Sequence, residues 1–122
     1  MKVLIVDDSK AMRMIVKRTL RQAGFNEIDV DEAGNGKEAI EKINADKPDL
    51  VLCDWNMPEM TGIECLEQLK SSGSDVKFGF VTSEGTPEMR QRASAAGALF
   101  LIAKPFTAET FKENLSSVLV SS

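Results

Sequence analysis

The sequence has no histidine, only two cysteines and no long apolar run. Without histidine, catalysis by an imidazole base and most zinc sites are excluded. Cys53 and Cys65 form no CxxC motif, so we expect two reduced thiols that pack as small hydrophobic side chains. No apolar stretch approaches the roughly 20 residues of a membrane-spanning helix, and the first apolar run, 3–6, is too short for a signal peptide. We therefore expect a cytoplasmic protein without membrane contact.

Basic clusters are lacking as well, and the formal net charge is −4. Nucleic-acid binding needs such clusters to neutralise phosphates, so this class is not expected. The chain of 122 residues has the usual size of one domain and is 43% hydrophobic, enough to bury a core without disulfides or a structural metal. Repeats and linkers are absent, which predicts a single domain over residues 1–122 with no output domain.

Short apolar runs alternate with segments of helical periodicity. Near-continuous apolar runs of this length are typical of strands buried on both faces of a parallel sheet. Gly24 and Pro48 end the first two helical segments, Thr86 and Pro87 start the fourth, and Thr107 is a helix cap for the last. Strands are expected at 2–6, 28–33, 49–54, 77–82 and 99–103, and the last helix carries Phe111, Leu115, Val118 and Leu119.

The alternation of strand and helix, repeated five times, predicts an α/β domain with a doubly wound parallel sheet. The strand order 2-1-3-4-5 is favoured, because the half-acidic segment 28–33 and the short segment 99–103 then lie at the edges of the sheet. Ligands of such sheets bind beyond the carboxyl ends of the strands where the order reverses. That point lies between the first and third strands.

Charged and polar residues stand at the carboxyl ends of four expected strands. Asp7 and Asp8 follow the first, Asp54 ends the third, Thr82 ends the fourth and Lys104 follows the fifth. Two carboxylates 4 Å apart repel by about 4 kcal/mol at an effective dielectric of about 20, so three in one pocket require a proton or a cation. A hard divalent ion such as Mg²⁺ suits oxygen ligands. One carboxylate can then attack phosphorus, while the ammonium and hydroxyl hold phosphoryl oxygens.

Each of these residues also has an ordinary structural explanation when it is taken alone. Asp8 before Ser9 is a common helix start, and Lys104 before Pro105 is a common turn. These explanations do not account for so many groups at one rim of the sheet.

These residues, together with the run DWNMPEMTG at 54–62, resemble response-regulator receiver domains, and especially the CheY-like members of chemotaxis type. The resemblance extends over the whole chain and implies a flavodoxin-like (βα)5 fold. It implies that Asp54 is the phosphoacceptor. It also implies that Asp8 and Asp54 bind Mg²⁺ directly, that Asp7 acts chiefly through water, and that Asn56 offers its backbone carbonyl; Mn²⁺ can substitute.

Further roles follow from the resemblance alone. Thr82 and Lys104 bind the phosphoryl group, and the peptide bond between Lys104 and Pro105 is cis. Asn56 and Glu84 match residue types of fast-cycling chemotaxis regulators, which implies hydrolysis of the phosphate in seconds to minutes.

The sequence departs from the family at its switch. Leu101 stands where the family usually has an aromatic residue three positions before the lysine, and Phe100 should point to the other face of the strand. We expect movement of Thr82 to shift the following loop, with an output face formed by the fourth helix, the fifth strand and the fifth helix, near Pro105. Leu101 is expected to be exposed there. Asn114 and Ser117 occupy positions where chemotaxis regulators carry lysines on the last helix.

The expected phosphodonor is a sensor histidine kinase, of the CheA type for a chemotaxis regulator. The expected target is a protein, either a flagellar motor switch or a phosphatase. The chain is expected to be a monomer. It should catalyse only its own phosphorylation and dephosphorylation. A phosphorelay intermediate or another stand-alone regulator remains an alternative, as does a receiver that no longer takes up phosphate. A phosphohydrolase of the haloacid dehalogenase type is a remote alternative, because it needs a second aspartate where Asn56 stands. An FMN site is disfavoured, since Asp7 and Asp8 would repel its phosphate.

Overall fold

The computed structural model describes residues 1–118, which form a parallel sheet and its covering helices. The strands are β1 (Lys2–Val6), β2 (Asp29–Ala33), β3 (Leu50–Cys53), β4 (Phe78–Thr82) and β5 (Leu101–Ala103). The helices are α1 (Lys10–Gln22), α2 (Gly36–Ala45), α3 (Gly62–Ser71), α4 (Pro87–Ala96) and α5 (Ala108–Leu115). The sheet order is β2-β1-β3-β4-β5, which confirms the predicted doubly wound fold.

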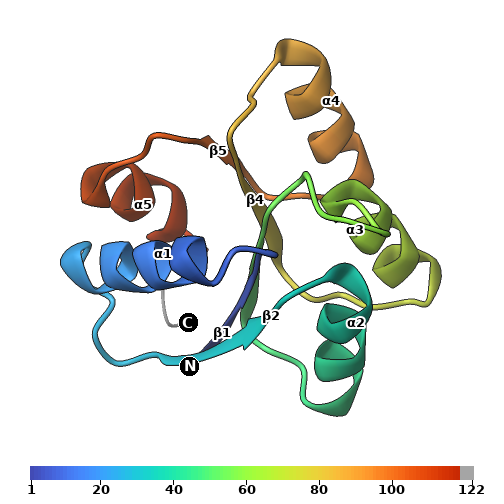
Figure 1. The fold of residues 1–122 in the computed structure, drawn as a ribbon, viewed down its shortest axis with the longest axis horizontal. Helices are drawn as coiled ribbons and strands as arrows, with labels where there is room; N and C mark the ends of the chain where they lie inside the picture. Colours follow the sequence, from blue (N-terminus) through green and yellow to red (C-terminus); the bar gives the residue numbers. More distant parts are fainter. Residues whose placement is uncertain (119–122) are drawn as a thin grey trace.

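Helices cover both faces of the sheet, with α1 and α5 on one side and α2, α3 and α4 on the other (Figure 1). Side chains of the central strands alternate between these two layers, as a strand of period two requires. In β1, Leu4 and Val6 join the core beneath α2, α3 and α4, whereas Val3 and Ile5 join the core beneath α1 and α5. Two apolar layers therefore hold the strand ends in a fixed register.

Local caps start the helices where the sequence predicts them. The Thr86 hydroxyl accepts the Met89 N–H at 3.1 Å with Pro87 in the first turn, and Thr107 caps α5. Ser9, rather than Asp8, caps α1 by accepting the Met12 N–H. The Asp8 side chain is therefore not the cap of this helix.

Both cysteines are free and buried, as predicted. Burial raises the pKa of the Cys65 thiol to about 12, so this group is not reactive near neutral pH. Within residues 1–118, no helix has the length and apolar character needed to cross a bilayer. Leu119, predicted for the last helix, lies outside the described residues.

The expected exposure of Leu101 is wrong. This side chain is buried, at 8% exposure, in the core beneath α4 together with Phe80 and Ala93. Phe100 packs in the opposite layer, so the predicted alternation is confirmed. The strand period places Leu101 on the α4 side, but whether that side is covered depends on the packing of α4. Leu99 is the exposed leucine in this region, at 52%.

Candidate functional site

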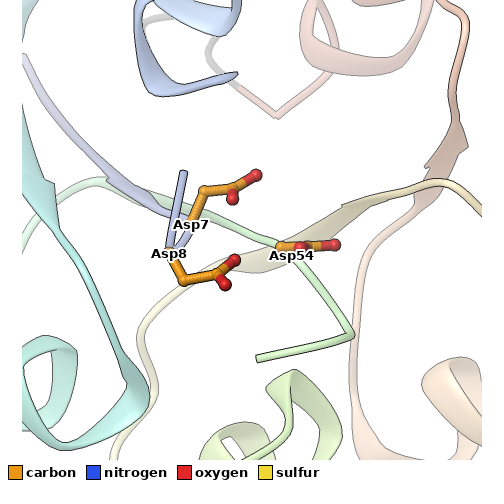
Figure 2. A group of neighbouring side chains, drawn as sticks. All are labelled: Asp7, Asp8 and Asp54. Carbon is orange, nitrogen blue, oxygen red and sulfur yellow. The ribbon is translucent and has the colours of Figure 1, made fainter. Parts of the chain in front are cut away.

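Three aspartates meet at the carboxyl ends of the two central strands β1 and β3. One oxygen of each of Asp7, Asp8 and Asp54 lies within 4.8 Å of the others. Figure 2 shows Asp7 and Asp8 side by side after β1, with their carboxyl groups extending toward Asp54. The backbone fixes this approach, because the Asp54 N–H donates to the Val6 carbonyl at 2.9 Å. The predicted acidic cluster is therefore present at the point where the strand order reverses.

Asp7 is the anchored member of the cluster. Its carboxylate is buried and accepts the Ser9 N–H at 2.9 Å, and its own N–H donates to the Ala33 carbonyl of β2 at 3.1 Å. Burial raises the pKa of Asp7, while the Ser9 N–H and the Lys104 ammonium oppose this rise. Asp8 is exposed at the mouth of the cluster. The two neighbouring carboxylates therefore differ: that of Asp7 is buried and hydrogen-bonded, whereas that of Asp8 is open to solvent.

Asp54 is buried at 8% exposure, and this burial raises the pKa of its carboxyl group to about 6. Lys104 lowers this pKa and Asp7 raises it, and the Trp55 and Asn56 N–H groups also lower it. A buried carboxylate is costly to ionise without a cation, and the neighbouring Lys104 ammonium offsets part of this cost. The ionised Asp54 carboxylate is therefore stabilised by a positive charge placed beside it.

Lys104 supplies the positive charge at this rim. Its ammonium lies 3.5 Å from an Asp7 oxygen and 3.8 Å from an Asp54 oxygen. The Lys104 N–H donates to the Thr82 carbonyl at 2.7 Å, and the peptide bond to Pro105 is cis as predicted. Thr82 is fully buried at the end of β4. One ammonium and three carboxylates leave a net negative pocket.

The donors suit a hard divalent cation. All three side chains are carboxylates, so every donor is an oxygen and none is a sulfur or nitrogen. Burial raises the pKa of two of them, Asp7 and Asp54. Mg²⁺ binds few carboxylates and keeps several waters, which the exposed side of Asp8 permits. The residues present therefore fit magnesium.

Two predicted residues lie beside this cluster in loops. Asn56 and Glu84 are exposed and follow Asp54 and Thr82 by two residues each. The Glu84 N–H is 3.5 Å from the Thr82 hydroxyl, which is a long contact. Their effect on phosphate cycling, and the carbonyl ligand from Asn56, stay predictions.

Two arginines near the site were missed from sequence. Arg13 in α1 donates to the Asp7 carbonyl, and Arg90 in α4 donates to the carbonyls of Gly85 and Leu101 at 3.2 and 3.0 Å. Arg13 lies three residues before Val16 and Arg90 three residues before Ala93, so each flanks the buried stripe of its helix. No local signal distinguishes an arginine that reaches a backbone carbonyl from one that is solvated.

The raised pKa of Asp54 predicts a pH-dependent stability of the metal-free protein. The folded state keeps the proton up to about pH 6, whereas an unfolded carboxyl loses it near 3.8. Stability from this group is therefore present at low pH and is lost as the pH rises through about 6. At pH 7, Asp54→Asn should raise the free energy of unfolding by about 1–3 kcal/mol, since one pKa unit is about 1.4 kcal/mol and solvent screens part of it.

Urea unfolding with a chelator, from pH 4 to 7, measures this difference. The gain of Asp54→Asn over wild type should shrink toward zero at pH 4, and exposed Asp29→Asn should show little change. A gain that is the same at both pH values would mean that the charge of Asp54 is not its origin.

Comparisons with known proteins show the family to which this chain belongs. Residues 3–116 match the family described as response regulator receiver domain. The chain is 42% identical to chemotaxis protein CheY1 of Helicobacter pylori, covering 98% of this chain and 97% of that one. It is 40% identical to chemotaxis protein CheY-3 of Vibrio cholerae, covering 97% and 91%. The solved structure of chemotaxis response regulator CheY4 of Vibrio cholerae superposes with a TM-score of 0.82 at 38% identity, covering 97% of this chain and 98% of that one. The chain therefore belongs to the response regulator receiver domain family and is a signalling protein of a two-component system.

Proposed function

We propose that the protein accepts a phosphoryl group on Asp54 from a phosphohistidine of a sensor kinase, with the help of Mg²⁺. The single observation that carries this proposal is the convergence of three carboxylate oxygens within 4.8 Å beside the Lys104 ammonium. Asp8 and Asp54 would bind the ion directly, Asp7 would act through water, and Mn²⁺ would serve as a substitute. The ion, when bound, neutralises negative charge between the aspartates and an incoming phosphate.

The reaction needs one bond to form and one to break. An Asp54 oxygen attacks phosphorus, the P–N bond to the donor imidazole breaks, and the imidazole leaves with a proton from solvent. Lys104 and the Thr82 hydroxyl bind the phosphoryl oxygens and stabilise their negative charge during the transfer. Hydrolysis returns the carboxylate when water attacks phosphorus, at a rate that Asn56 and Glu84 set from the exposed rim. The protein thus catalyses only its own phosphorylation and dephosphorylation.

A chemotaxis regulator is the best-supported pathway role. Two of its relatives, CheY1 of Helicobacter pylori and CheY-3 of Vibrio cholerae, are chemotaxis proteins, and the chain covers 97% and 91% of their lengths. This supports a receiver domain over residues 1–122 that signals through protein contacts, and we propose that it acts as a monomer in the cytoplasm. The donor would be a CheA-type kinase, and the target a flagellar motor switch or a phosphatase. Asn114 and Ser117 lack the lysine charge that the family resemblance implies for that surface, so a phosphorelay partner is the second candidate.

Switching would begin at Thr82. Movement of its hydroxyl toward a phosphoryl oxygen would carry the 83–87 loop with it. Within α4, Ala93 is the buried side chain, so a shift of this helix disturbs little packing. Leu101 would take part through its buried contacts beneath α4, rather than as an exposed partner contact. Pro105, in the adjacent turn, is exposed and could contact a partner directly. The output face would be formed by α4, β5 and α5.

The test uses Trp55, which adjoins Asp54 and packs against Phe80 at a centroid distance of 4.9 Å. Mg²⁺ and then beryllofluoride are added while tryptophan emission is followed. We expect a saturable change with Mg²⁺ and a further change with beryllofluoride, because both alter the charge next to the indole.

Asp54→Asn is the matched control, since it keeps the size of the side chain and removes its charge. It should show no beryllofluoride response, and mass spectrometry after treatment with acetyl phosphate should detect added phosphate in the wild type alone. Equal responses in both proteins would reject Asp54 as the acceptor.

A further inference from the structure

Arg13 lies one turn into α1 and reaches back to the strand end that carries the acidic pair. Its Nη1 donates to the Asp7 backbone carbonyl at 2.6 Å, and its Nε donates to Glu32 Oε1 of β2 at 2.8 Å. The side chain is only 16% exposed. A planar guanidinium with two engaged donors has little freedom, so both contacts are geometrically fixed.

These contacts close a ring of hydrogen bonds around the end of β1. The Asp7 N–H donates to the Ala33 carbonyl, and Ala33 directly follows Glu32 in β2. Arg13 itself is tied to the start of α1, because its N–H donates to the Ser9 carbonyl at 3.0 Å. Asp7 is therefore held from β2 through its N–H and from α1 through its carbonyl oxygen.

We propose that Arg13 is a positioning residue, which holds the Asp7–Asp8 turn so that both carboxylates face Asp54 and can bind Mg²⁺. This inference rests on the proposed function, because it concerns the affinity of the same site for its cation. Arg13 donates to the backbone of Asp7 and not to a carboxylate of the cluster. Its charge is paired with Glu32.

Positioning and simple electrostatics predict opposite results for Arg13→Met. Removal of a positive charge near three carboxylates would tighten cation binding if charge alone mattered. Loss of the contact to Asp7 frees the turn, so cation binding should weaken, by about 10-fold, the lower end of the range for groups that orient metal ligands. The sign of the change therefore separates the two explanations.

The experiment is titration calorimetry of Mg²⁺ into the wild type, Arg13→Met, Arg13→Lys and Arg18→Met. Arg18 is exposed on the same helix, and its substitution removes the same formal charge without touching the turn. We expect Arg13→Met to bind about 10-fold more weakly and Arg18→Met to equal the wild type. Arg13→Lys should be intermediate, because its single nitrogen replaces two nitrogens, Nε and Nη1, that each donate to a separate acceptor.

Unchanged or tighter binding by Arg13→Met would overturn the inference and leave the proposed function intact. Absence of Mg²⁺ binding by the wild type would overturn both. Urea unfolding in a chelator confirms that the variants are folded, and if Arg13→Met is not, Arg13→Lys decides, since full wild-type affinity in that variant would contradict a two-contact role.

Discussion

Replacement of Lys104 by methionine is expected to slow phosphoryl transfer to Asp54 by about 100- to 1,000-fold, the range for loss of one preorganised charge-stabilising group. The ammonium lies 3.5 Å from Asp7 and 3.8 Å from Asp54, and it is the cation that these two carboxylates contact within residues 1–118. Without it, a phosphate dianion would approach three carboxylates with less neutralisation. Methionine keeps much of the length and apolar character of the lysine stem, so packing should change little.

The same substitution should tighten Mg²⁺ binding, because a competing positive charge leaves the pocket. Acetyl phosphate reactions followed by mass spectrometry give the rate, and calorimetry gives the affinity. Lys112→Met removes an exposed charge from α5 and is the control, with both quantities expected at wild-type values. If Lys104→Met weakened cation binding and transfer in parallel, Lys104 would be maintaining the fold of the rim rather than acting on phosphate.

Gly62→Ala is expected to lower the free energy of unfolding by about 3 kcal/mol, near the upper end for forcing an atom into a packed site. A Cβ at this position would lie 2.2 Å from the Asp54 carbonyl oxygen and 2.8 Å from a ring carbon of Phe80. The Gly62 N–H also donates to the Trp55 carbonyl at 2.8 Å, so α3 cannot move away without breaking this bond. The usual helix preference for alanine over glycine, about 1 kcal/mol, is too small to compensate.

Urea unfolding measures this loss, and Mg²⁺ affinity should fall with it, because the clash pushes on the backbone of Asp54. Gly34→Ala is the matched control: a Cβ there meets its nearest atoms at 3.8 Å, an ordinary contact. Similar losses for the two variants would show that glycine content, and not the approach of α3 to Asp54, governs the effect.

The acidic cluster was predictable because its information is local. Asp7 and Asp54 directly follow apolar runs, and strands that run parallel bring their carboxyl ends to one edge. The missed contact of Arg13 has no such signal, because it joins a helix to a strand end through a backbone carbonyl. Such a contact depends on a side-chain rotamer and on the distance between two elements, which residue type and spacing do not specify.

By itself, the sequence determined the alternation of five strands and five helices, the edge positions of β2 and β5, and the set of polar residues at the rim, because all three follow from hydrophobic period and chain order. Tertiary structure alone decided the burial of Leu101 and the hydrogen bonds from Arg13 to the Asp7 carbonyl and to Glu32. It also decided the pKa of about 6 at Asp54. These properties arise from what packs against a residue from other elements, and burial and electrostatic interaction act through space rather than along the chain.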